Sequence, residues 1–97
     1  MRFEIVLAPE AVEDLRRLKA NVRAKVLASI ETHLKHEPRK QSRSQIKRLR
    51  GIRRPEYRLR ADEARVFYDV KDPKVEILAI IIKSEATEWL AQFAEPE

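Results

Sequence analysis

The chain has no cysteine and only one glycine among its 97 residues. Without cysteine it can form neither a disulfide nor a thiolate metal site, which fits the reducing conditions of the cytoplasm. A single glycine cannot build a glycine-rich phosphate-binding loop, and the two histidines do not form an HExxH pattern. We therefore expect neither a bound metal nor a cofactor.

Long hydrophobic segments are also missing. The apolar run in the opening residues, MRFEIVLAPE, contains Arg2 and Glu4 and is too short for a signal peptide or a membrane span. A chain of this length can close one hydrophobic core but not two. The sequence predicts a single cytoplasmic domain over residues 1–97 that makes no contact with a membrane.

Basic residues are in excess and are concentrated in the middle of the chain. Lysine and arginine number 21 against 16 aspartates and glutamates, which gives a net charge of +5 and a pI near 9.8. From residue 39 to residue 60 the only carboxylate is Glu56. The basic residues of this segment are Arg39, Lys40, Arg43, Lys47, Arg48, Arg50, Arg53, Arg54, Arg58 and Arg60. This local excess predicts a polyanionic partner.

The first half of the sequence predicts one strand and two helices. Residues 2–7 have strand composition, and apolar residues recur at helical spacing over residues 10–20 after Pro9. Asn21 is the expected N-cap of a second helix, which Pro38 would end. The apolar stripe of this second helix is Val22, Val26, Ile30 and Leu34. The two helices are expected to form an antiparallel hairpin whose arginines, Arg16, Arg17 and Arg23, face solvent.

The second half predicts three strands and a closing helix. Residues 37–45 have no apolar side chain apart from proline and indicate a loop, and Gly51 begins a turn. Alternating residues predict a hairpin of strands 57–60 and 64–70, and residues 75–82 are apolar on both faces, as in a central strand. The last helix is expected to open at Ser84.

The element order predicts an α+β domain: one strand, two helices, three strands and one helix. The helical hairpin would pack on one face of a small, mainly antiparallel, twisted sheet. The opposite face would be open and basic.

Three arginines lie on that opposite face by the alternation of the predicted hairpin. Arg58, Arg60 and Arg65 point away from the apolar face that carries Tyr57, Leu59, Val66 and Tyr68. Like charges aligned across two strands repel, and a guanidinium matches the oxygens of a phosphate. The arrangement favours an anion site. The alternative is that Asp62, Glu63 and Asp69 neutralise the face.

The segment LRGIRRPEYRLRADEARVFYDVKDPKVEILAI resembles the RelE/ParE superfamily of bacterial toxins from type II toxin-antitoxin modules. The residues that carry the resemblance are Leu49, Gly51, Tyr57, Arg58, Arg60, Arg65, Tyr68 and the apolar strand 75–82. The resemblance implies a cognate antitoxin and one of two activities. RelE-type members cut mRNA in the ribosomal A site without metal, by attack of the 2′-hydroxyl on the adjacent phosphate, whereas ParE-type members inhibit DNA gyrase and cleave nothing.

The resemblance also implies roles for individual residues. Arg58 and Arg60 would bind the phosphate or take part in proton transfer, and Arg65 would stabilise the transition state. The closing segment KSEATEWLAQF lacks the tyrosine or histidine that is usual there, which leaves Lys83 and Tyr57 as substitutes. An inactive RNA-binding or ribosome-associated module is a third possibility.

Two further groups of residues are predicted to make contacts. The RNA backbone contacts expected from the basic segment are Arg43, Lys47, Arg48, Arg50, Arg53 and Arg54. The hydrophobic residues of the closing helix, Trp89, Leu90 and Phe93, are candidates for antitoxin binding, or they pack that helix on the sheet.

Overall fold

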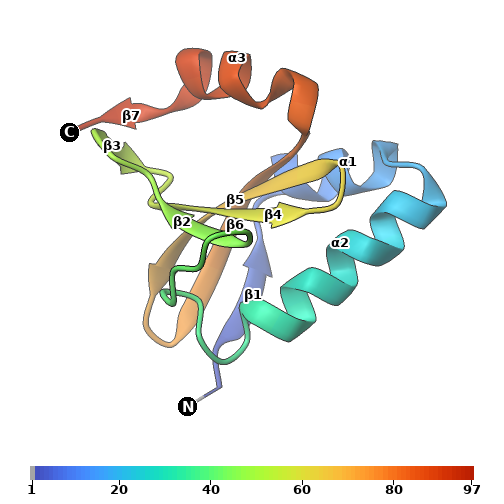
Figure 1. The fold of residues 1–97 in the computed structure, drawn as a ribbon, viewed down its shortest axis with the longest axis horizontal. Coiled ribbons are helices and arrows are strands. Elements are labelled where there is room, and N and C mark those ends of the chain that lie inside the picture. The colour runs from blue at the N-terminus through green and yellow to red at the C-terminus, as the bar shows by residue number, and fades with distance from the viewer. Residues whose placement is uncertain (1) are drawn as a thin grey trace.

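A five-stranded sheet forms the centre of the computed structural model, which describes residues 2–97 (Figure 1). The strand order in this sheet is β1-β6-β5-β4-β2. In chain order the elements are β1 (Glu4–Leu7), α1 (Pro9–Arg17), α2 (Ala20–His33), β2 (Ile46–Arg48), β3 (Ile52–Arg54), β4 (Tyr57–Ala61), β5 (Ala64–Lys71), β6 (Lys74–Ile82), α3 (Lys83–Phe93) and β7 (Glu95–Pro96). The chain is thus a mixed α+β domain with a mainly antiparallel sheet, as predicted.

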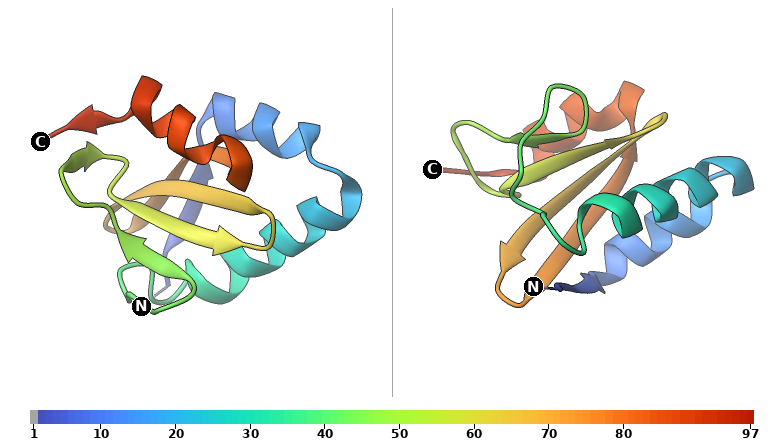
Figure 2. Two further views of the ribbon diagram at one scale, coloured as in Figure 1. Left: turned by 45° about the horizontal axis from the view of Figure 1, so that its top comes forward. Right: turned by 60° about the horizontal axis from the view of Figure 1, so that its bottom comes forward.

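The position of β6 explains why its sequence is apolar on both faces. It pairs in parallel with β1, where Glu4 lies opposite Lys74, and antiparallel with β5, where Val66 lies opposite Ile80. Helices lie against it on each side of the sheet, α1 on one face and α3 on the other (Figure 2). A strand covered in this way reads as a continuous hydrophobic run.

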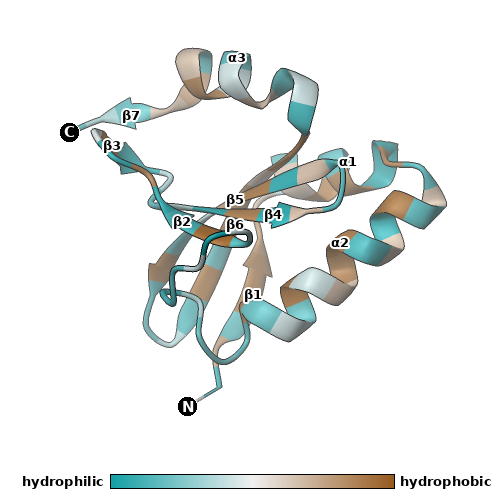
Figure 3. Ribbon diagram, in the orientation of Figure 1, coloured by the Kyte–Doolittle hydropathy of each residue, from teal (hydrophilic) through white to brown (hydrophobic). Residues whose placement is uncertain are grey.

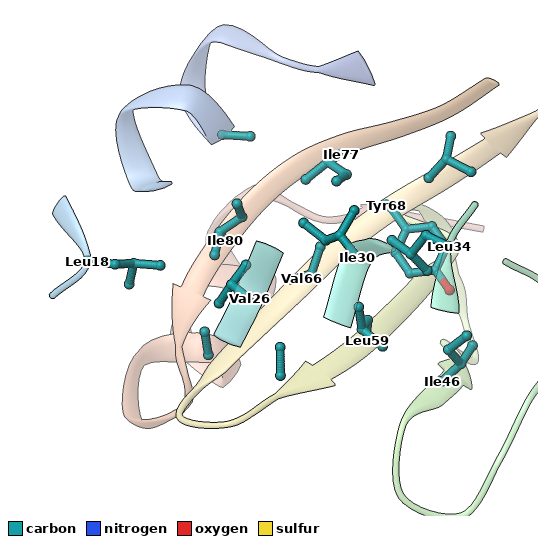
Figure 4. Packing of buried hydrophobic residues seen from close by; sticks show 14 of the residues in the cluster. Leu18, Val26, Ile30, Leu34, Ile46, Leu59, Val66, Tyr68, Ile77 and Ile80 are labelled. Atoms are coloured by element: carbon teal, nitrogen blue, oxygen red, sulfur yellow. The ribbon is translucent and has the colours of Figure 1, made fainter. Parts of the chain in front are cut away.

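The hydrophobic core lies between the sheet and the pair α1 and α2 (Figures 2 and 4). The apolar stripe predicted for the second helix points into it. Figure 4 labels ten of its members: Leu18, Val26, Ile30, Leu34, Ile46, Leu59, Val66, Tyr68, Ile77 and Ile80. Burial of these side chains removes apolar surface from water and supplies the main stabilisation of the fold. None of the helices in residues 2–97 is long and apolar enough to cross a membrane.

The junction of α1 and α2 differs from the prediction. Helix α1 ends at Arg17 rather than at residue 20, because the buried Leu18 leaves helical geometry at φ −71° and ψ 146°. Helix α2 then begins at Ala20 with Lys19 as its N-cap, so the prediction of Asn21 as the cap is wrong. Arg23 donates to the carbonyl oxygens of Leu15, Arg16 and Leu18 at 3.2, 3.3 and 2.8 Å. Arg23 therefore closes the end of α1 and is not an ordinary solvent-facing residue.

The C-terminal segment adds features that the sequence did not indicate. Helix α3 begins at Lys83, one residue before the predicted Ser84, because Ile82 already serves as its N-cap. After α3, strand β7 pairs with β3 in a separate two-stranded sheet. Gly51 adopts φ +72° at the turn before β3, and its carbonyl oxygen accepts the backbone N–H of Glu97 at 3.2 Å. This pairing fastens the end of the chain beside the β3 turn (Figure 1).

Candidate anion-binding face

The β4–β5 hairpin places the predicted arginines on the sheet face opposite the main core. Arg60 lies opposite Arg65, and Arg58 lies between Lys47 of β2 and Phe67 of β5. Because Leu59 and Val66 are fully buried toward α2, the alternation of the strands directs their neighbours the other way. We call Lys47, Arg58, Arg60 and Arg65 the arginine face.

Charge on the arginine face is not balanced within the described part of the chain. No ion pair among residues 2–97 includes Arg58, Arg60 or Arg65. Asp62 instead lies 3.6 Å from the ammonium of Lys25, and Asp69 lies 3.5 Å from the guanidinium of Arg54. The side chain of Glu63 is exposed and joins none of these pairs. The alternative of internal neutralisation by Asp62, Glu63 and Asp69 is therefore not what the structure contains.

Burial makes this unbalanced charge more costly. Partial burial, and then the charge of Arg60, lower the pKa of Arg58. Burial lowers the pKa of Arg65 as well, with smaller effects of Arg60 and Arg58. The Nε of Arg58 is buried and has no hydrogen-bond partner among residues 2–97. A bound anion would supply the missing acceptor and offset the repulsion between the guanidinium groups.

Arg65 is held in a defined orientation by the turn beside it. Its Nη1 donates to the backbone carbonyl oxygens of Asp62 and Ala64 at 3.1 and 2.9 Å. Asp62 adopts φ +57°, in the left-handed region that aspartate tolerates better than most residues. These bonds engage one nitrogen and leave the rest of the guanidinium fork without a partner in residues 2–97, which pre-organises it for an external ligand.

The two predicted substitutes for a general acid occupy different places. Tyr57 packs toward the core and stacks on Tyr68, with ring centroids 5.4 Å apart, because it shares the face of Leu59. It therefore lies on the opposite side of the sheet from the arginine face, and this position does not support a catalytic role for Tyr57 among the arginines. Lys83 is exposed at the start of α3, and its backbone N–H donates to the carbonyl oxygen of Glu63 at 2.8 Å. That bond joins the start of α3 to the turn that orients Arg65.

Three of the six residues predicted to contact RNA have partners inside the molecule. Arg48 donates to the carbonyl oxygens of Leu49, Ile52 and Glu56. The other two form ion pairs: Arg53 lies 2.6 Å from Glu95, and Arg54 bridges Asp69 and Glu76. Arg43, Lys47 and Arg50 are exposed and belong to none of the ion pairs of residues 2–97. Contacts with RNA by this second group need no rearrangement of the fold.

The chain matches one known protein family over most of its length. Residues 5–87 match the family described as the ParE toxin of type II toxin-antitoxin system, parDE. The chain belongs to the ParE toxin family. No curated protein sequence matches it significantly. The resemblance to the RelE/ParE superfamily is therefore confirmed.

Solved structures show the same fold for this ParE-family chain at low sequence identity. Free E. coli toxin RelE, in mutant form, has a TM-score of 0.70 and 23% identity over 94% of this chain and 93% of its own. The archaeal RelE–RelB complex from Pyrococcus horikoshii OT3 gives 0.69 and 23%, covering 86% and 97%. The RelB–RelE antitoxin-toxin complex from Methanococcus jannaschii gives 0.67 and 17%, covering 87% and 96%. These similarities establish the RelE-like architecture.

In this ParE-family toxin, α3 covers part of the sheet face that carries the arginines. Trp89 stacks on Phe67 with ring centroids 4.9 Å apart and an interplanar angle of 14°. Figure 3 shows apolar residues along this surface helix. Phe67 is fully buried, although it lies on the side of the hairpin that carries Arg58 and Arg65. The sequence contains one indication of this burial. Phe67 is an apolar residue between the charged Arg65 and Asp69 on that side of β5, and an apolar side chain in such a position is expected to pack against another element.

Proposed function

We propose that this toxin is a ribosome-dependent mRNA endoribonuclease that inhibits translation in the cytoplasm. The observation that supports the proposal is the arginine face, where three guanidinium groups lie together without a carboxylate partner in residues 2–97. Such a face matches a phosphate-rich ligand in charge and in hydrogen-bonding geometry. Single-stranded mRNA held in a ribosomal site supplies that ligand.

The proposed reaction is attack of a ribose 2′-oxygen on the adjacent phosphorus. The bond from phosphorus to the 5′-oxygen breaks, which leaves a 2′,3′-cyclic phosphate and a 5′-hydroxyl. Negative charge develops on the oxygens of the phosphorane, and the oriented fork of Arg65 is placed to donate to it. Arg58 and Arg60 would hold the scissile phosphate.

Proton transfer needs groups other than the arginines. Arginine remains protonated at neutral pH, so the arginine face donates hydrogen bonds and does not accept the 2′-hydroxyl proton. Lys83 is the proposed donor to the leaving 5′-oxygen, because its backbone bond to Glu63 holds it at the end of the hairpin that carries Arg65. The ribosome would supply the base. The residues of the chain described here, 2–97, contain no cluster of histidine or carboxylate side chains that could hold a metal ion.

Primer extension on translated mRNA tests the proposal. Inducing the parent chain should create new 5′ ends inside coding regions within minutes, and Arg65→Ala should not create them. An untranslated copy of the same RNA is the matched control and should stay intact. Growth arrest without new ends would exclude the nuclease, and growth without arrest would point to an inactive RNA-binding or ribosome-associated module.

Inhibition of DNA gyrase is the second candidate. The match to a family described as ParE favours it, and so does the position of Tyr57, which leaves the arginine face without a tyrosine or histidine acid. A supercoiling assay with purified gyrase separates the two proposals. Gyrase inhibition, filamentous cells and induction of the DNA-damage response, with mRNA intact, would establish the second and exclude the first.

We further propose that the toxin is neutralised by a cognate antitoxin. The archaeal RelE relatives were solved with RelB, and a YoeB from Staphylococcus aureus was solved with YefM. Acidic or apolar side chains of the antitoxin would cover the arginine face and the residues Trp89, Leu90 and Phe93 of α3. Co-expression with the adjacent gene should restore growth and give a complex on size-exclusion chromatography, and robust growth without that gene would contradict the proposal.

A further inference from the structure

Three aromatic rings form a column that rises from the sheet to the surface. Phe67 of β5 is fully buried at its base. Trp89 of α3 stacks on it at 4.9 Å, and Phe93 lies one helical turn further on, 5.8 Å from Trp89 at an interplanar angle of 37°. The rings of Phe67 and Trp89 are nearly parallel and stack, which orients Trp89, and Phe93 lies beside Trp89 on the same face of α3.

The outer ring of the column is open to solvent. Phe93 is 62% exposed, the largest exposed fraction among the large hydrophobic residues described. The two others, Val12 and Leu27, belong to α1 and α2, which pack on the opposite face of the sheet. No side chain of α3 is fully buried. Packing of the core therefore does not account for an aromatic ring at position 93.

The base of the column is adjacent to the arginine face. Phe67 lies directly opposite Arg58 in the β4–β5 ladder. Stacked aromatic rings beside basic side chains are the combination with which proteins hold single-stranded nucleic acids, because rings stack on bases and cations contact phosphates. We propose that Phe93, supported by Trp89 and Phe67, is a platform on which a nucleobase stacks while a neighbouring phosphate lies on the arginine face.

Charge decides between a nucleic acid and an apolar peptide as the occupant. A purely hydrophobic segment of a partner protein would cover the aromatic column but would leave Arg58, Arg60 and Arg65 unbalanced. A single strand satisfies both, since it carries flat bases and one negative charge per nucleotide. The antitoxin proposed above, with acidic as well as apolar side chains, would compete with the nucleic acid for the same surface. The inference rests on the proposed function, because the platform would bind a nucleobase of the same RNA strand whose phosphate lies on the arginine face.

The only tryptophan of the chain reports on the platform directly. Titrating the purified full-length chain with a short single-stranded oligonucleotide should quench the fluorescence of Trp89, because a base that stacks on the column lies close to its indole. An oligonucleotide of the same length with abasic sites has the same phosphates and no bases. It should bind more weakly, by about tenfold per base that reaches the platform, and should leave the emission nearly unchanged.

Substitutions at the outer ring separate stacking from general hydrophobicity. Phe93→Leu keeps an apolar side chain, so it should lower affinity for the base-containing strand about tenfold and leave affinity for the abasic strand unchanged. Phe93→Tyr should restore the loss. Leu27→Ala, an exposed apolar residue on the opposite face, is the matched control and should change neither affinity.

The outcomes separate the platform from the proposed function. Equal affinity for the two strands, or a Phe93→Leu variant that binds like the parent, would overturn the platform and leave the arginine face as a phosphate site. Failure of both strands to bind would overturn the platform together with phosphate binding by the arginine face. A Phe93→Leu variant that lost only antitoxin binding would assign the ring to the antitoxin and also overturn the platform.

Discussion

Arg60 is the residue through which the guanidinium groups of the arginine face repel one another. It lies directly opposite Arg65, and after burial its charge is the next cause that lowers the pKa of Arg58 and of Arg65. Like charges in this position cost a few tenths of a kcal/mol to about 1 kcal/mol. Residues that bind ligands often carry such a cost in the free protein.

Neutralising Arg60 should therefore stabilise the free toxin. We expect Arg60→Gln to raise the free energy of unfolding in urea by up to about 1 kcal/mol at low ionic strength, because it removes a like charge opposite Arg65. The gain should shrink at high salt, which screens the repulsion between exposed charges. Arg16→Gln is a control from a solvent-exposed pair with Glu13. A loss of stability in Arg60→Gln would show that the arginine face is internally balanced.

Arg65 and Arg43 should respond differently to substitution. Arg65→Lys keeps the charge but removes the fork that two backbone carbonyl groups orient, so mRNA cleavage should fall roughly 100-fold while ribosome binding changes little. Arg43→Ala removes an exposed charge, so it should weaken binding modestly, reduce its salt dependence by about one unit or less and leave cleavage intact. Ribosome binding and primer extension, measured in parallel, test both. An Arg65→Lys chain that cleaves like the parent would remove Arg65 from the reaction.

Helix α3 is the least buried of the three helices in residues 2–97. None of its side chains is fully buried, and it rests on the sheet through the contact of Trp89 with Phe67. The pairing of β7 with β3 fastens the residues that follow it. Elements with few buried contacts open more often than the core does.

Hydrogen exchange should show this difference between helices. Amides of α3 should exchange faster than those of α2, whose residues Val22, Val26 and Ile30 are buried. Trp89→Ala should speed exchange in α3 by several-fold to about tenfold, because it removes the ring stack, and should leave α2 unchanged. Equal protection of the two helices in the parent chain would contradict the weak attachment of α3.

The contact between α1 and β6 gives the fold a pH dependence. Burial raises the pKa of Asp14, although its carboxylate accepts the backbone N–H of Ile80 at 3.0 Å. Arg17 opposes the shift and Glu10 adds to it, while Glu63 and Glu85 line the same surface pocket. A raised pKa means that the folded state binds the proton more tightly than the unfolded state does. This group therefore lowers stability as pH rises from the ordinary aspartate range through its folded pKa.

Replacing Asp14 should remove that dependence. The amide oxygen of Asp14→Asn can still accept the N–H of Ile80, but it carries no charge to bury. We expect a higher urea midpoint than the parent at neutral pH and a smaller difference at acid pH, where Asp14 of the parent is protonated. Unfolding curves from acid to neutral pH test this. If the parent had the higher urea midpoint at neutral pH, the charged carboxylate of Asp14 would be stabilising the fold through its hydrogen bond with Ile80.

Across the whole molecule, patterns of alternation predicted more than local signals did. The buried stripe of α2, the strands β4 to β6 and the orientation of Arg58, Arg60 and Arg65 all follow from periodicity, because burial on one face imposes it. Cap residues were less reliable. Asn21 resembles an N-cap, but the burial of Leu18 and the bonds of Arg23 fix the junction two residues earlier.

Contacts between distant segments could not be predicted from local sequence. The pairing of β3 with β7 depends on where α3 ends, and the burial of Phe67 depends on where α3 lies. The same holds for the ion pairs of Arg53 and Arg54, which join residues far apart in the chain. The composition of residues 39–60 predicted a positively charged segment. Only the tertiary fold distinguishes the arginines that form ion pairs or hydrogen bonds inside the molecule from those that do not.

The parallel pairing of β1 with β6 orders events during synthesis of the chain. Glu4 lies opposite Lys74, so β1 leaves the ribosomal exit tunnel 70 residues before its partner in the sheet. At about 5 to 20 residues per second, that delay is on the order of ten seconds. The apolar side of α1 lacks most of its packing surface during this delay, since α1 packs mainly on β6. The central sheet can therefore be completed only after most of the chain has been translated.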